Sequence, residues 1–186
     1  MIASSRGVYF CRVPLAYRNL CASPAAVEAL SNYKGENYPF RVELDVQFSD
    51  LDCFKHVNNA RYFTYFETAR CKVSEQLGLP LLTSPRGDAG SDAEVGPVLA
   101  ATSCVFKRQV SWPDRLCVGM RCTDLRRDRG QFTQHYALWS ETGGYMAATG
   151  HADIVMMHLA GEKFGTRAAV PSSWLDVFFP GLITDG

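Results

Sequence analysis

The sequence lacks an excess of charge of either sign: 19 Lys and Arg residues stand against 19 Asp and Glu residues in a chain of 186. Because proteins that bind nucleic acids usually carry a basic excess, this balance argues against that class. No apolar run approaches the ~18 residues of a membrane-spanning helix, so no transmembrane segment is predicted. Charge blocks are missing while aromatic residues make up 12%, which excludes a long disordered chain. The length predicts one domain with a single core.

The sequence also lacks any C-x-x-C pair, although it contains seven cysteines. An odd number of cysteines at irregular spacing is not typical of a secreted disulfide framework. The four histidines lie far from any close cysteine pair, so a structural zinc site is not expected. We therefore expect free thiols that mostly serve as small core residues, with Cys53 among them.

Acidic residues are missing from the first 27 residues, which contain Arg6, Arg12 and Arg18. This composition is typical of a mitochondrial targeting segment, and an ordinary N-terminal extension is the alternative. Ser23 followed by Pro24 predicts an N-cap and the first turn of a short helix. We therefore divide the chain into an N-terminal extension over residues 1–38 and one domain over residues 39–186. The expected location is the mitochondrial matrix, with the cytoplasm as the alternative.

A strand and a long helix are predicted on either side of a polar segment. Apolar and polar residues alternate over residues 41–48, the period of a half-buried strand. Residues 49–59 are rich in Asp, Asn and His and predict a loop. Beyond them, side chains that are apolar except for one Arg recur at helical spacing. The members of that stripe are Phe63, Phe66, Arg70, Val73 and Leu77. Asn58 or Asn59 is a suitable N-cap, and Gly78 ends the helix.

Four further strands are predicted over residues 98–110, 116–122, 132–141 and 145–158, with short turns between them. Short connections favour an antiparallel meander, because parallel strands need long crossovers. Residues 81–96 predict a flexible loop, and the aromatic segment 171–179 is expected to pack back on the body. The fold class is therefore α+β, with a curved antiparallel sheet wrapped around one long central helix.

The loop between the first strand and the helix reads SDLDCFKHVNNARY from Ser49 to Tyr62. It resembles the hotdog-fold thioesterases of the 4-hydroxybenzoyl-CoA thioesterase type and is also similar to plant acyl-acyl-carrier-protein thioesterases, which share a D-x-D-x-x-x-H-V-N-N-x-x-Y pattern. The resemblance implies an acyl-CoA thioesterase that releases free acid and CoA with no metal and no organic cofactor. It also implies a homodimer or homotetramer with acyl-CoA as substrate.

The resemblance assigns Asp52 as the nucleophile or general base, and a carboxylate suits either role. It places the N–H of Asn59, at the positive end of the helix, against the thioester carbonyl oxygen. His56 is the third catalytic candidate, because a neutral imidazole can orient the acid or the water. The candidate substrate-binding residues are Asn58, Tyr62 and Arg108, the last through the phosphates of CoA.

Each assignment has a purely structural alternative. Asp50 and Asp52 precede a helix and suit turn or capping roles, and Asp50 is expected to tolerate substitution by Asn far better than Asp52. The two Asn residues are suitable helix caps, His56 can tie the loop, and Tyr62 can pack against the sheet. Basic residues such as Arg108 and the cluster at 126–129 are often simply solvated. Phe54 departs from the plant enzymes, which have Asn at that place.

Two other functions compete with hydrolysis. A non-catalytic acyl-CoA-binding protein could keep the same fold, but it would have no need of the acid at Asp52. A hotdog dehydratase is less favoured, because those enzymes use a different arrangement of Asp and His.

Overall fold

A computed structural model of the protein describes residues 23–79 and 95–180. The predicted targeting segment and most of the predicted 81–96 loop lie outside the described residues. The helices are α1 (Pro24–Ser31), α2 (Asn59–Gln76) and α3 (Ser172–Phe178), with short 3-10 helices η2 (Phe48–Asp50) and η4 (Arg127–Arg129). The strands are β1 (Phe40–Asp45), β2 (Val95–Phe106), β3 (Arg115–Arg126), β4 (Gln131–Ser140) and β5 (Tyr145–His158). No helix in this part of the chain is long and apolar enough to span a bilayer.

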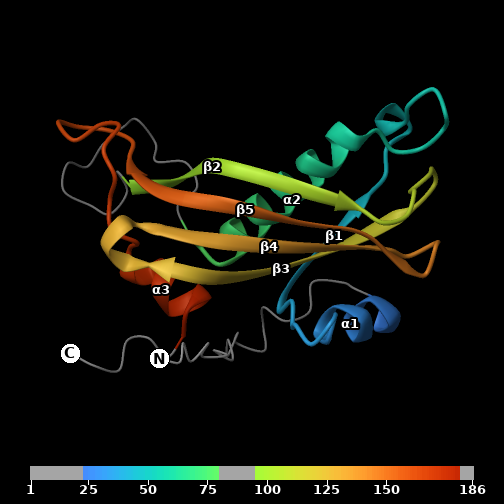
Figure 1. Cartoon of the computed structure of the whole chain (residues 1–186), viewed down its shortest axis with the longest axis horizontal. Coiled ribbons are helices and arrows are strands. Elements are labelled where there is room, and N and C mark those ends of the chain that lie inside the picture. Colours follow the sequence, from blue (N-terminus) through green and yellow to red (C-terminus); the bar gives the residue numbers. More distant parts are fainter. Residues whose placement is uncertain (1–22, 80–94, 181–186) are drawn as a thin grey trace, which may run out of the picture.

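The five strands form one antiparallel sheet in the order β1-β3-β4-β5-β2 (Figure 1). The predicted meander is confirmed for β3, β4 and β5, but β2 pairs with β5 at the far edge instead of lying beside β3. The connection over residues 107–114 permits this, because eight extended residues reach ~26 Å. Three strand spacings amount to only about 14 Å. The short connection between β2 and β3 therefore does not require these two strands to be neighbours in the sheet.

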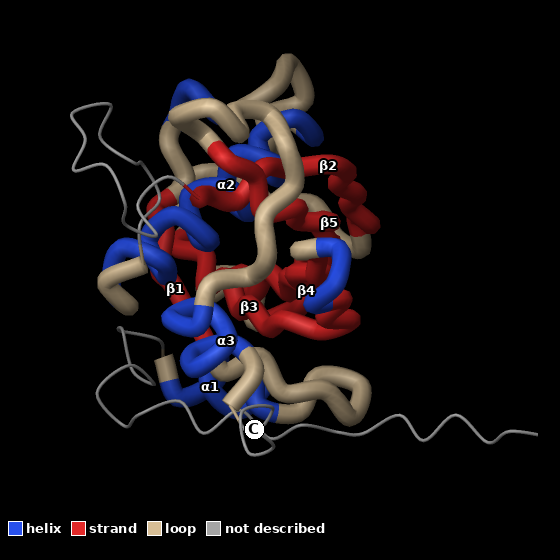
Figure 2. Tube along the Cα trace, turned by 90° about the vertical axis from the view of Figure 1, so that its left-hand side faces the viewer, coloured by secondary structure: helices blue, strands red, loops and turns tan. Residues whose placement is uncertain are grey.

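Helix α2 lies on the concave side of the curved sheet (Figure 2), which confirms the predicted fold class. It begins after its N-cap Asn58 and ends just before Gly78, whose φ of +66° suits glycine. The predicted apolar stripe is wrong at Phe63, which is 37% exposed, whereas the neighbouring Tyr62 and Tyr65 are buried. Because Tyr62 and Phe63 are both aromatic, the sequence alone did not determine which of them faces the sheet. Packing of the helix against the sheet determined it.

The first strand is shorter than its alternation predicts. β1 ends at Asp45, and Phe48 is 72% exposed at the start of η2 instead of being buried. The cause is local, because the Asp50 carboxylate accepts a hydrogen bond from the Gln47 N–H and turns the chain out of the strand. The Phe48 ring instead contacts Trp112 edge to face at 5.6 Å.

Helix α1 packs on the outer face of the sheet, opposite α2. It is capped by Ser23, as the sequence predicted, and buries Ala26 and Leu30 with Tyr38, Cys117 and Ala137. Gly119 allows this approach, since a Cβ there would lie 2.8 Å from both Leu30 and Tyr38. Helix α1 and Tyr38 are thus packed on the sheet, and the boundary at residue 38 stays a prediction.

The C-terminal aromatic segment forms α3 and closes one end of the inner core, as expected. Phe178 contacts Phe40 at 5.2 Å between ring centroids and also stacks near Phe132. Trp174 is 1% exposed in the same cluster.

Candidate active site

The loop from residue 50 to residue 58 is a small hairpin that leads into α2. Its two arms are joined by hydrogen bonds from Asn58 N–H to the Asp50 carbonyl (2.9 Å) and from Asp52 N–H to the His56 carbonyl (2.8 Å). The turn between them uses Lys55 in the left-handed region, with φ of +62°. The Val57 N–H donates to the Val110 carbonyl at 2.8 Å, which docks the hairpin onto the segment that leads into β3. The loop is therefore held by backbone hydrogen bonds, both within itself and to Val110.

Asp52 is half-buried at the start of this turn. Its Oδ1 accepts hydrogen bonds from the N–H of Phe54 (2.8 Å) and of His56 (3.2 Å). Within residues 23–79 and 95–180, no group donates a hydrogen bond to Oδ2. One oxygen thus closes the turn, while the second is available to water or substrate.

The N-terminus of α2 follows directly. The Asn58 side chain accepts a hydrogen bond from Ala60 N–H at 3.0 Å, and its carbonyl accepts one from Arg61 N–H. No acceptor for the Asn59 N–H occurs in the described part of the chain. This N–H therefore remains as a donor at the positive end of the helix dipole.

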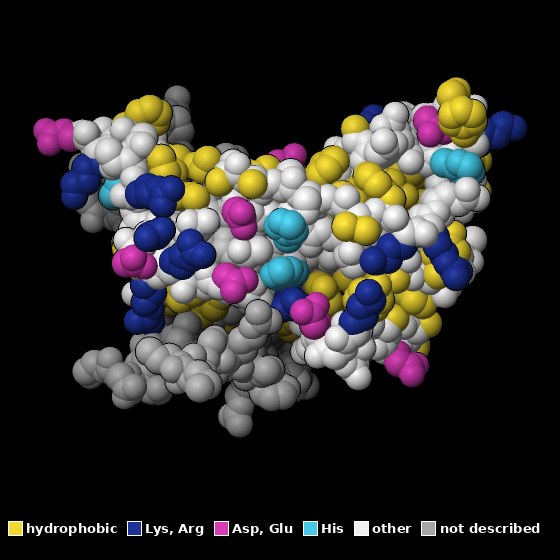
Figure 3. Space-filling model, viewed as in Figure 1, with side chains coloured by type: hydrophobic (Ala, Val, Ile, Leu, Met, Phe, Trp, Pro, Cys, Tyr) yellow, Lys and Arg dark blue, Asp and Glu magenta, His cyan; other side chains and the backbone are white. Residues whose placement is uncertain are grey.

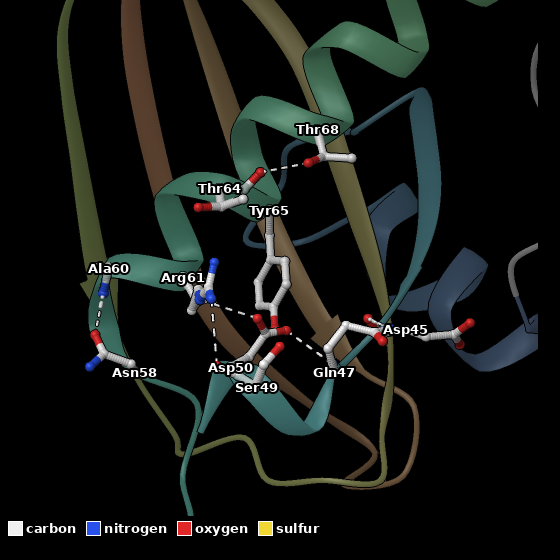
Figure 4. Close-up of polar contacts among 10 residues, drawn as sticks. All are labelled: Asp45, Gln47, Ser49, Asp50, Asn58, Ala60, Arg61, Thr64, Tyr65 and Thr68. Atoms are coloured by element: carbon white, nitrogen blue, oxygen red, sulfur yellow. Dashed lines mark hydrogen bonds and ion pairs between the residues drawn. The ribbon is translucent and has the colours of Figure 1, made fainter. Parts of the chain in front are cut away.

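The buried carboxylate of Asp50, at the base of this hairpin, is the centre of a polar network (Figure 4). The Oδ2 atom accepts hydrogen bonds from Tyr65 Oη at 2.7 Å and from Gln47 N–H at 2.9 Å, and Oδ1 pairs with Arg61 Nε at 3.2 Å. Burial and the adjacent carboxylate raise the pKa of Tyr65, so its hydroxyl keeps its proton and donates. This network was not predicted from the sequence, although the D-x-D motif and the spacing of Arg61 and Tyr65 along the helix contain its members.

The other predicted site residues lie at different depths. His56 is half-buried, and its backbone N–H and carbonyl both bond to Asp52. Tyr62 is 3% exposed and packs edge to face on Phe106 at 5.0 Å. Desolvation raises the pKa of Tyr62 to about 12, so its hydroxyl is neutral. Tyr62 thus forms part of the core between α2 and β2, and its contact with substrate stays a prediction.

Arg108 lies beyond the strand on which the sequence placed it. β2 ends at Phe106, and the exposed Arg108 side chain lies over the Tyr145 ring, with 5.0 Å from Cζ to the centroid. The regular pairing of β2 with β5 ends here, because the N–H groups of Lys107 and Arg108 both donate to the carbonyl of Ala147. A role of Arg108 toward CoA phosphates stays a prediction.

Cys53 is a further correction. It is exposed in the turn and is not a core residue, because the turn points it away from the body. Among the cysteines that the structure describes, Cys117 is the fully buried one, and desolvation raises its pKa to about 12. In residues 23–79 and 95–180, no group of three or more His, Cys, Asp or Glu side chains is placed to hold a metal ion.

Comparison with known proteins agrees with this arrangement. The α+β architecture, with a five-stranded antiparallel sheet around a central helix, is that of hotdog thioesterases. Residues 46–178 match the model of the thioesterase-like superfamily, and the chain belongs to this family. Residues 13–77 also match the C-terminal domain of acyl-ACP thioesterases. No curated protein matches.

Three solved structures illustrate the similarity. A thioesterase from Thermus thermophilus, complexed with coenzyme A and Zn, is 28% identical, with 77% of this chain and 99% of that chain covered and a TM-score of 0.58. A protein from Aquifex aeolicus is 26% identical, with 75% and 99% covered and a TM-score of 0.61. The 1,4-dihydroxy-2-naphthoyl-CoA thioesterase of Synechocystis, at 19% identity, 75% and 94% coverage and a TM-score of 0.61, shares the fold.

Proposed function

We propose that the protein hydrolyses the thioester of an acyl-CoA to a free carboxylic acid and CoA. The observation that carries the proposal is the position of Asp52, in an ordered turn that leads into the N-terminus of the central helix of a thioesterase-like fold. A thioester is already activated, so the reaction mainly needs a carboxylate and a donor for the carbonyl oxygen. The Asn59 N–H supplies that donor, typically worth a few kcal/mol at the transition state.

Asp52 acts by one of two routes. As a general base it takes a proton from water, the hydroxide adds to the carbonyl carbon, and the C–S bond breaks to release the CoA thiolate, which gains the proton. As a nucleophile its free oxygen attacks the carbonyl, the thiolate leaves, and water hydrolyses the mixed anhydride. Label found in Asp52 after a single turnover in ¹⁸O-water would establish the anhydride route, because hydrolysis at the Asp carbon of the anhydride places it there.

The substitution Asp52→Asn tests the proposal sharply. Asn keeps the Oδ1 acceptor that closes the turn and removes only the charge, so a residue with a purely structural role would tolerate it. We expect turnover to fall by about 10²-fold or more with the fold intact. Release of thiol from a panel of alkyl and aryl acyl-CoAs, followed with a chromogenic reagent, measures the rate.

Asp45→Asn is the matched control, since the Asp45 side chain is 67% exposed and pairs only with Arg115 among the described residues. Its turnover should equal that of the wild type. Near-normal turnover of a folded Asp52→Asn protein would disprove the mechanism. A wild type that binds acyl-CoA but releases no thiol would favour the non-catalytic binder. His56→Ala should give an intermediate loss if the imidazole only orients the site.

We further propose a homodimer, or a tetramer built from dimers. β2 is an edge strand of 12 residues whose exposed apolar side chains include Val98, Leu99, Val105 and Phe106. An open edge of this kind is prone to pairing, and a second copy would satisfy its N–H and C=O groups. Light scattering at micromolar concentration should show no dominant monomer, and a monomer with full activity would contradict the proposal.

Two finer points belong to the same proposal. Arg108 is the candidate for binding the CoA phosphates, and Arg108→Gln should raise KM for acyl-CoA more than it lowers kcat.

The mitochondrial matrix is the proposed location, on the basis of the acid-free, Arg-containing N-terminal composition. Fusion of residues 1–38 to a fluorescent reporter tests it, and a reporter that stays in the cytoplasm would contradict it.

A further inference from the structure

We infer that Asp50 is a positioning residue, whose buried carboxylate sets where the Asp52 carboxylate and the Asn59 N–H lie relative to each other. The inference rests on the proposed function, because it concerns the two groups assigned to that reaction. It reverses the expectation from the sequence, in which Asp50 was the tolerant neighbour of Asp52.

The first observation is burial with full pairing. The Asp50 side chain is 8% exposed, and a carboxylate removed from water to this extent is costly unless donors surround it. Its two oxygens receive three donors: a backbone N–H, a phenolic hydroxyl and a guanidinium. The carboxylate therefore has little freedom to move without losing a charge-assisted hydrogen bond.

The second observation is the origin of those donors. Gln47 lies just after β1, while Arg61 and Tyr65 belong to the first two turns of α2 (Figure 4). The Asp50 carbonyl also accepts the N–H of Asn58, the N-cap of that helix. One residue thus ties the strand end, the hairpin and the helix start together.

The third observation is the place of this junction in the chain. Asp52 follows Asp50 by two residues, and Asn59 follows the hydrogen-bonded Asn58 by one. Leu51 pairs with Val57 between them, so a shift of Asp50 moves both arms of the hairpin. A misplacement of about 1 Å between reacting groups can cost on the order of 10²-fold in rate.

A purely stabilising role accounts less well for these groups. A buried ion pair is weak evidence for stability, since apolar side chains of similar size often do as well. Here the Arg61 side chain is 43% exposed, which weakens its pairing energy further. The geometric restraint on the hairpin is the feature that an apolar pair would not reproduce.

The test combines two variants with a matched control. Asp50→Asn removes the charge, Tyr65→Phe removes one hydroxyl at the same oxygen, and Asp45→Asn is the control because it makes the same change at an exposed carboxylate. We expect Asp50→Asn to lower kcat by about 10- to 100-fold and Tyr65→Phe by about 3- to 10-fold, with KM within about 3-fold. Because both act through one oxygen, the double variant should fall no further than Asp50→Asn.

Amide hydrogen exchange supplies a readout that does not depend on activity. Asp50→Asn should speed exchange at residues 51–59 while strands β3 and β4 keep their protection. Wild-type kcat in a folded Asp50→Asn protein, or additive losses in the double variant, would overturn the inference. If Asp50→Asn does not fold, Tyr65→Phe decides alone, and its wild-type kcat would overturn the inference.

Failure of the proposed function would be recognised separately. If the wild type releases no thiol from any acyl-CoA, the proposed hydrolysis fails. The exchange measurement then decides the placement of the hairpin by itself, because unchanged exchange at 51–59 in Asp50→Asn overturns the role of Asp50 and faster exchange supports it.

Discussion

The two faces of the sheet differ in what covers them. The concave face packs its alternate side chains, such as Leu116, Val118 and Met120 of β3, against α2 and α3 in one large apolar cluster. The convex face has a small apolar cluster under α1. Figure 3, which views the convex face, shows histidine and acidic side chains near its centre with Lys and Arg toward both sides. The same strands thus contribute to two apolar clusters of unequal size. Most of the free energy of unfolding is expected from the larger, inner cluster.

The largest effect is expected from the inner layer. Phe66 is 1% exposed and stacks on Tyr136 with 4.8 Å between ring centroids. Phe66→Ala should lower the free energy of unfolding by about 3–5 kcal/mol, through lost burial and the cavity left behind. Urea denaturation measures the loss. Phe63→Ala, on the same helix but 37% exposed, should lose less than half as much, and equal losses would contradict the assigned rotation of α2.

A smaller effect is expected from the outer layer. Leu30 is 0% exposed in the cluster under α1, and Leu30→Ala should cost about 2–3 kcal/mol. Because α1 carries none of the proposed catalytic groups, turnover at a temperature below unfolding should be retained.

The same reasoning predicts that a chain beginning at Tyr33 melts at lower temperature than one beginning at Ser23, because it exposes Cys117 and Ala137. Equal melting temperatures would show that α1 adds nothing to the fold.

The smallest effect is expected from the polar centre of the outer face. His135 on β4 lies opposite His151 on β5. Thr123 Oγ1 lies 2.8 Å from the Nε2 atom of His135. Desolvation, and next the positive charge of Arg121, lower the pKa of His135 below its ordinary 6.5. The other titratable groups around it are Glu36, Asp124 and His151.

The sign of the pH effect follows from that direction. The unfolded chain binds the proton at higher pH than the folded one, so the contribution is fully present above about pH 6.5 and is lost as the pH falls through the lowered value. His135→Gln should flatten the decline of melting temperature between about pH 7 and pH 5 in wild type. His158→Gln is the control, and an unchanged slope in His135→Gln would contradict the assignment.

The sequence predicted much of the fold because its signals were local. Ser23 with Pro24 marked the start of α1, and Asn58 with Gly78 marked the limits of α2, since capping and left-handed residues act within a few positions. The alternation in β3 likewise separated its two faces. The predicted rotation of α2 failed at Phe63, where two adjacent aromatic residues satisfied the same pattern.

The candidate site was predictable only in part. The motif put Asp52 in the loop and Asn59 seven residues later at the start of the helix, and the structure has both in those elements. It said nothing of Asp50 as a buried group, since its burial depends on Tyr65 and Arg61 being folded back over it by the helix. Exposure of Cys53 was missed for the same reason, because the direction of a turn residue depends on the turn.

The sequence by itself determined the elements, their order, the α+β class and the loop that carries the motif, since each depends on residues close together in the chain. Only the tertiary structure decided that β2 lies beside β5, that α1 covers the outer face, and that Asp50 anchors the hairpin. Those features join segments that lie from a few to more than a hundred residues apart. Their pairing is decided by which apolar and charged groups find partners in space, and no local pattern records that.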